Sequence, residues 1–146
     1  MTTKYQSVVL KGIRDALNSV KATLEIPKVS VDELSTQRDS ISVGIETGEG
    51  SKERIADCTG TAYSGTLRVS LVYRAMQSVS GMDDLNYMTL LDNCYQYLRA
   101  NYKSISGTGW FLDGITQPEG AVLSQVYQGG VKDFKTIILV EYERSV

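Results

Sequence analysis

The chain has 146 residues, of which 42% are hydrophobic, and this size is typical of one globular domain that buries about two-thirds of its unfolded surface. Its 15 basic and 17 acidic residues give a formal net charge of -2, a balance that disfavours a protein wrapping nucleic acid by neutralising phosphates. The absence of histidine excludes a Ser-His-Asp or Cys-His relay and removes the usual acid–base group near neutral pH.

The first predicted element is an amphipathic helix close to the N-terminus. Apolar residues recur there at the helical spacing of one buried stripe: Tyr5, Val8, Val9, Gly12, Ile13, Ala16, Leu17 and Val20. Thr2 or Thr3 is a suitable N-cap, and the glycine in the stripe indicates that another element packs closely against it. Segment 20–39 contains Pro27, which cannot continue a helix, and we predict a mostly extended connector there.

Two strands with an alternating pattern are predicted next, at 40–46 and 66–74. In the second, four residues alternate with mostly polar ones and are predicted to form a buried face: Leu67, Val69, Leu71 and Tyr73. One buried and one polar face is typical of an antiparallel sheet covered on one side. Between these strands, segment 47–58 is predicted to be a polar, mobile loop with a weaker strand at 54–58, followed by turns at Thr59-Gly60 and Ser64-Gly65.

A second amphipathic helix is predicted to begin near Ser80, where Ser80-Gly-Met-Asp83 is similar to a capping box. Its main apolar stripe is Leu85, Met88, Leu91, Tyr95, Leu98 and Tyr102. A second apolar flank consists of Tyr87, Leu90, Cys94 and Tyr97. Because this arc is broad, we expect the helix to contact both the sheet and a further surface, either the first helix or another subunit.

The last third of the chain predicts strands at 110–116, 121–128 and 134–143, with a turn at 117–120. The final strand is apolar on both faces at its centre, with Ile137 and Leu139 on the face opposite Ile138, as expected for an interior strand or one buried by assembly. The element order therefore predicts one α+β domain over 1–146. It should contain a mostly antiparallel sheet with two amphipathic helices packed on one face.

Candidate catalytic and ligand-binding chemistry is sparse. Asp83 and Asp84 occupy the first turn of a helix, where acids favour the helix dipole, and we prefer this to a catalytic dyad. Segment 48–52 lacks the order of a phosphate loop. Cys58 and Cys94 are expected to be reduced packing residues rather than a disulfide. No metal-ligand spacing occurs either, so we predict no catalytic, cofactor or metal residues, and no enzyme.

Surface chemistry instead indicates protein–protein contacts, because tyrosine, of which the chain has nine, is favoured in interfaces. Base stacking by Tyr95, Tyr97 and Tyr102 is the weaker alternative. The predicted interface residues come from the second helix, the polar loop and the last strand: Tyr87, Leu90, Tyr97, Glu49, Lys52, Glu53, Arg54, Ile137 and Leu139. With no apolar run near the ~20 residues of a membrane span and no signal-peptide pattern, we expect a cytoplasmic chain without membrane contact.

Over most of its length the chain resembles the tail terminator, or tail completion, proteins of tailed bacteriophages, a group that includes chains labelled minor capsid proteins. The resemblance rests on size and on three segments: Asp39-Ser-Ile-Ser-Val-Gly-Ile45, Thr66-Leu-Arg-Val-Ser-Leu-Val-Tyr-Arg74 leading into a long helix, and Ile115-Thr-Gln-Pro118 through Val140-Glu-Tyr-Glu143. It does not extend to the connector or the polar loop. It implies a ring, usually a hexamer, that caps the finished tail tube.

The resemblance also implies the partners of such a ring. These are further copies of the chain, the major tail tube protein and a head-completion or connector protein, with genomic DNA passing the lumen without specific binding. The protein would then belong to the tail or neck of a virion assembled in a bacterial cytoplasm. Two alternatives stay open: another connector or neck protein of the same virion, and a small-ligand or regulatory binding module on an α+β scaffold.

Overall fold

A computed structural model describes residues 4–24, 26, 29–31, 40–45, 52–55, 62–76, 81–118, 120–127 and 131–145. The helical elements are α1 (Lys4–Ser19), α2 (Lys21–Leu24), α3 (Gly81–Asn101) and the short 3-10 helix η1 (Tyr102–Ser104). The strands are β1 (Val29–Val31), β2 (Ser40–Ile45), β3 (Lys52–Ile55), β4 (Ala62–Met76), β5 (Ser106–Gly107), β6 (Trp110–Thr116), β7 (Val122–Tyr127) and β8 (Val131–Ser145).

The described strands form one sheet around two long central strands, β4 and β8. These two pair antiparallel along their whole length, from Ala62 opposite Ser145 to Met76 opposite Val131. The strand order is β1-β2-β4-β8-β6-β5, and β3 also pairs with β4 while β7 pairs with β8. The α+β class is confirmed. The sheet is mixed rather than mostly antiparallel, because β1, which the sequence did not predict as a strand, joins β2 in parallel.

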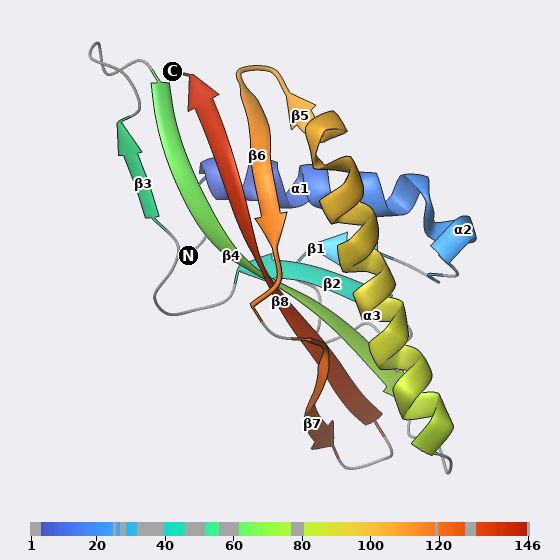
Figure 1. The fold of residues 1–146 in the computed structure, drawn as a ribbon. Coiled ribbons are helices and arrows are strands. Elements are labelled where there is room, and N and C mark those ends of the chain that lie inside the picture. The colour runs from blue at the N-terminus through green and yellow to red at the C-terminus, as the bar shows by residue number, and fades with distance from the viewer. Residues whose placement is uncertain are drawn as a thin grey trace.

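The long strands twist along the length of the molecule, as shown in Figure 1. β3 and β6 flank the end that holds the C-terminus, whereas β7 lies at the opposite end. Helix α1 lies across the long strands, and α3 runs along them (Figure 1). Of the two alternatives for the last strand, an interior strand or one buried by assembly, the first is observed, since β8 lies between β4 and β6.

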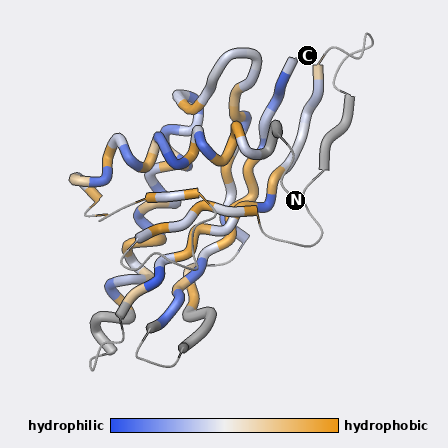
Figure 2. Tube along the Cα trace, turned by 180° about the vertical axis from the view of Figure 1, so that it is seen from behind, coloured by the Kyte–Doolittle hydropathy of each residue, from blue (hydrophilic) through white to orange (hydrophobic). Residues whose placement is uncertain are grey.

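One face of this sheet, here called the core face, packs against both helices in a single hydrophobic cluster. The buried residues of the core face include Leu67, Val69, Leu71, Tyr73, Phe134, Thr136, Ile138, Val140 and Tyr142. The helices contribute Val9, Leu10, Ile13, Leu17, Leu91, Cys94, Tyr95 and Leu98. The hydrophobic parts of the chain gather where strands and helices meet (Figure 2). The predicted buried face of β4 is thus confirmed.

Leu71 lies at the centre of the core face and is 0% exposed. Replacing it with alanine should lower the free energy of unfolding by about 2–5 kcal/mol, because the substitution removes buried methyl groups and leaves a cavity. The same substitution at Leu85, which is 56% exposed, is the matched control and should change stability by less than about 0.5 kcal/mol. Equal denaturation midpoints for the two variants would show that Leu71 is not a core residue.

Several element boundaries differ from those predicted. Leu85 was assigned to the buried stripe of the second helix, but its side chain is mostly exposed. A short helix, α2, interrupts the connector that was predicted to be extended. Within the segment predicted to be a polar loop, β3 pairs with β4, so that part is a strand that begins two residues before the weak strand expected at 54–58.

The predicted turn at Ser64-Gly65 is wrong, because both residues lie inside β4. The reason is a close packing contact from the neighbouring strand. A Cβ atom at Gly65 would lie 2.5 Å from the Cζ atom of Tyr142, which is the cross-strand partner of Gly65 on β8. Glycine is therefore required here for the approach of an aromatic ring rather than for a turn.

Candidate interaction surfaces

The predicted flank on α3 packs largely within its own subunit. The ring of Tyr87 stacks on that of Tyr73 with 5.0 Å between centroids and lies 5.4 Å from the ring of Phe134. Leu90 and Tyr97 are likewise half-buried against the hydrophobic core. Helix α3 also contacts α1, besides β4, β6 and β8. The breadth of the apolar arc is therefore explained by the fold, and only the outer part of each side chain remains accessible.

The face of the sheet opposite the helices, here called the outer face, carries Ile137 and Leu139 of the predicted interface. Both are half-buried, and they pair in register with Ser70 and Arg68 of β4. The outer face also presents Phe111, which is 46% exposed, and Val122, which is 51% exposed. The sequence did not single out these two residues, because each lies in the middle of a run of three apolar residues, at 110–112 and 121–123, which does not show which member faces outward.

The charged residues predicted in segment 47–58 are only partly placed. Glu49 lies outside the described residues. Lys52, Glu53 and Arg54 belong to β3, where their backbones pair with Thr66, Gly65 and Ser64 of β4. The directions of these three side chains also lie outside what the structure describes. The backbone of β3 pairs with residues 63–66 of β4, whereas β2 pairs with residues 69–74. The role of these three residues in an interface stays a prediction.

An ion pair lies at the other end of the outer face. Arg74 on β4 and Asp133 on β8 are cross-strand partners. The Nε and Nη2 atoms of the arginine donate to the two carboxylate oxygens at 2.8 and 3.0 Å. The aspartate is 2% exposed, so this pair is held inside the protein rather than offered to a ligand. A bidentate pair of this kind fixes the register of the two strands.

A polar groove of about 260 Å³ lies between α1 and the segment after α3. It is lined by Gly12, Asp15, Ala16, Ser19, Tyr97, Ser104, Ile105 and Ser106. Two of its hydroxyls already donate to backbone carbonyls, Ser19 to Ala16 and Ser104 to Asn101. Asp15 pairs with Arg14. Three of the polar side chains that line the groove are therefore engaged locally: Asp15, Ser19 and Ser104.

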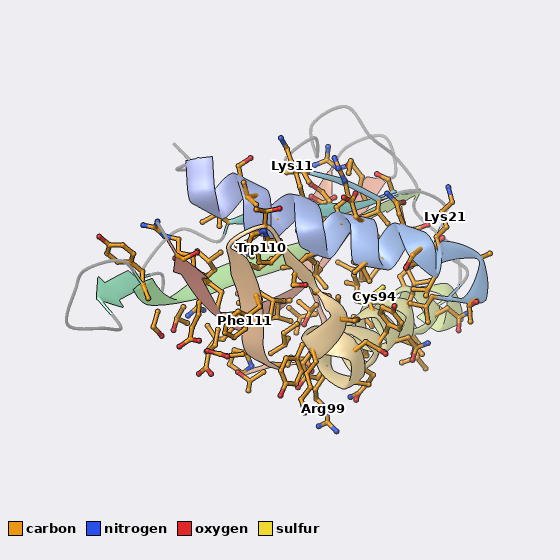
Figure 3. The ribbon with its side chains drawn as sticks, turned by 90° about the horizontal axis from the view of Figure 1, so that it is seen from above. Lys11, Lys21, Cys94, Arg99, Trp110 and Phe111 are labelled. Atoms are coloured by element: carbon orange, nitrogen blue, oxygen red, sulfur yellow. The ribbon has the colours of Figure 1, made fainter. Side chains whose placement is uncertain are left out.

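No group of three or more histidine, cysteine, aspartate or glutamate residues in the described part of the chain is placed to hold a metal ion. A search of the same residues also finds no helix with the length and hydrophobicity to cross a membrane. Cys94 of α3 lies on the side of that helix that faces α1, whereas Lys11, Lys21 and Arg99 point outward from their own helices (Figure 3).

Cys94 is a free thiol with 0% exposure, and burial raises its pKa to about 12. Because the thiolate is the reactive form, Cys94 should resist modification in the folded protein. We expect a Cys58→Ser variant to remain unlabelled by a thiol reagent at pH 8 and to label fully in denaturant. Labelling of the native variant as fast as in denaturant would show that this part of the helix is exposed.

Comparison with known proteins shows likeness in structure alone. No family model matches the chain, and no curated protein sequence matches it. Among solved structures, a chain of the "Virion of native gene transfer agent (GTA) particle" is similar with a TM-score of 0.53 and 11% sequence identity. The alignment covers 97% of this chain and 99% of that chain. At this identity the likeness shows that the two chains share a fold over nearly their whole lengths.

Proposed function

We propose that the protein is a structural component of a phage-like virion and, within that class, a tail terminator. The observation that carries the proposal is the fold shared from end to end with a chain of a gene transfer agent virion. The alignment covers 97% of this chain and 99% of that chain, so the likeness involves all the main elements of the fold and not one motif alone. The three segments that resemble tail terminators supply the more specific assignment.

The distribution of apolar side chains supports assembly. Leu85 is exposed on α3, and Phe111 and Val122 are exposed on the outer face. These positions lie on different sides of the subunit. A closed ring needs such an arrangement, because one patch must meet a different patch on the next copy. Single exposed apolar residues also occur on monomers, so the ring depends mainly on the fold likeness and the resemblance.

In this proposal, copies of the chain form a ring, usually of six subunits, at the head-proximal end of the tail tube. The ring contacts the major tail tube protein on one side and a head-completion or connector protein on the other. The net charge of -2 agrees with a lumen through which DNA passes without being held, since tight phosphate binding requires an excess of basic residues.

Electron microscopy of tail tubes assembled with and without the purified protein tests this function. With the protein, tubes should have a uniform length and carry an added ring at one end. A parallel mixture with tail-less heads separates the terminator from a connector, which would bind the heads instead. Tubes of uncontrolled length without an added ring at either end would contradict the terminator proposal.

A further inference from the structure

We propose that the polar groove between α1 and the segment after α3 binds a small organic cation, an ammonium or guanidinium group on a short aliphatic chain. The groove has a volume of about 260 Å³. Sites that take drug-sized ligands measure roughly 300–1,000 Å³, so a ligand of this groove is smaller than those. The site does not involve Leu85, Phe111 or Val122, which support ring formation, and it does not depend on the assignment of the protein to a tail.

Two serine hydroxyls in the groove can only accept a further hydrogen bond. Ser19 donates its hydroxyl proton to the carbonyl oxygen of Ala16 at 2.7 Å, and Ser104 donates its proton to that of Asn101 at 2.8 Å. Each serine oxygen keeps its lone pairs but has no second proton to donate. A ligand that contacts Ser19 and Ser104 must therefore supply the protons. Ammonium and guanidinium groups are rich in N–H donors and have no acceptor.

Asp15 gives the groove its negative charge. Its ion pair with Arg14 uses Oδ1 alone, which the Nε and Nη2 atoms of the arginine contact at 3.0 Å each. The other carboxylate oxygen, Oδ2, makes no hydrogen bond with a described residue. An ion pair between exposed neighbours contributes little to stability, so it leaves the carboxylate able to bind a ligand. Arg14 and Lys103 adjoin lining residues in the sequence, but no described basic residue lines the groove.

The remaining wall of the groove suits the aliphatic chain of such a cation. Ala16 and Tyr97 are half-buried there, and Ile105 is buried. The face of the Tyr97 ring also attracts a cation. The hydroxyls of Tyr97 and Ser106 make no hydrogen bond with a described residue, so both can accept one from the ligand. An aromatic ring and a carboxylate in one groove favour a cation over an anion or a neutral ligand.

Titration of the isotope-labelled protein with n-butylguanidinium chloride, followed by NMR, tests the site. The probe should shift the backbone amide signals of residues 12–19 and 104–106. Binding should saturate with a dissociation constant of about 1 mM, as expected for a ligand of so few atoms. n-Butanol has the same chain without the charge, and butyrate has the opposite charge. Both should shift these signals much less than the probe does.

Three variants assign the binding to the groove. Asp15→Asn should weaken binding of the probe at least about tenfold, because it removes the charge of the strongest acceptor. Asp113→Asn, the same change at an exposed position on β6, is the control and should bind as the wild type does. Ala16→Leu should also weaken binding at least about tenfold, because the larger side chain fills the groove while Asp15 is retained. Its amide spectrum shows whether the fold is intact.

The cationic group can come from a free small molecule or from an arginine or lysine side chain of another copy of the chain. Sedimentation velocity with and without the probe distinguishes these sources. If the ligand is a free cation, the probe leaves the mass of the protein unchanged. If a side chain of another copy occupies the groove, the probe lowers the mass of the assembly towards 16.1 kDa.

Three results would overturn the proposal. The first is a shift of the groove signals by n-butanol that equals the shift by n-butylguanidinium. The second is an Asp15→Asn variant that binds the probe as tightly as the wild type. The third is a set of signal changes confined to residues outside the groove.

Discussion

Replacing Asp133 with alanine should lower the free energy of unfolding by about 3–5 kcal/mol, as expected for the loss of one partner from a buried ion pair. The side chains of Arg74 and Asp133 are only 14% and 3% exposed. The substitution removes the carboxylate that both arginine nitrogens contact and leaves a guanidinium in a poorly hydrated place. Urea denaturation followed by circular dichroism measures the loss.

The double substitution Arg74→Met with Asp133→Leu separates two quantities. One is the cost of leaving a buried charge without its partner, and the other is the net contribution of the ion pair to the free energy of unfolding. Two apolar side chains of similar size remove both charges together, and the double variant should be close to the wild type in stability. If the pair instead contributes a large net stabilisation, the double variant will be as unstable as Asp133→Ala. A small effect of Asp133→Ala alone would mean that the site is well hydrated.

Much of the fold could be predicted from local patterns. The bounds of β6 were predicted at 110–116, and the buried face of β4 follows from strict alternation, because period-two burial is set within a single strand. The sequence reasoning missed β1 and β5, which have three and two residues and are too short to show a period. The turn expected at Ser64-Gly65 failed because the need for glycine arises from Tyr142, a residue distant in sequence.

The candidate surfaces were harder to predict than the fold. The broad apolar arc of the second helix was expected to contact the sheet and either the first helix or another subunit. Within the subunit α3 contacts α1, and Tyr87 reaches Tyr73 and Phe134 of the sheet. A helical period shows which residues share an apolar face, but it does not show which element of the fold will cover that face.

Trp110 is predicted to be the other large contributor to stability, and its replacement by alanine should lower the free energy of unfolding by about 3–5 kcal/mol. The indole is 7% exposed and lies beneath α1 in Figure 3. It is held between two glycines, Gly12 of α1 and Gly107 of β5. A Cβ atom at Gly12 would lie 2.6 Å from the Cη2 atom of Trp110, and one at Gly107 would meet its Nε1 atom.

The effect of Gly12→Ala on the free energy of unfolding should change sign when Trp110 is removed, and this provides a sharper test of the packing. In the wild type, Gly12→Ala should destabilise by about 1–3 kcal/mol, because the new methyl group must displace the indole. In a Trp110→Ala background the obstacle is gone. Alanine should then stabilise α1 by up to about 1 kcal/mol, since it is a better helix former than glycine. The two effects, measured by urea denaturation, have opposite signs only if the indole occupies the space above Gly12. The same sign in both backgrounds would mean that another group limits that position.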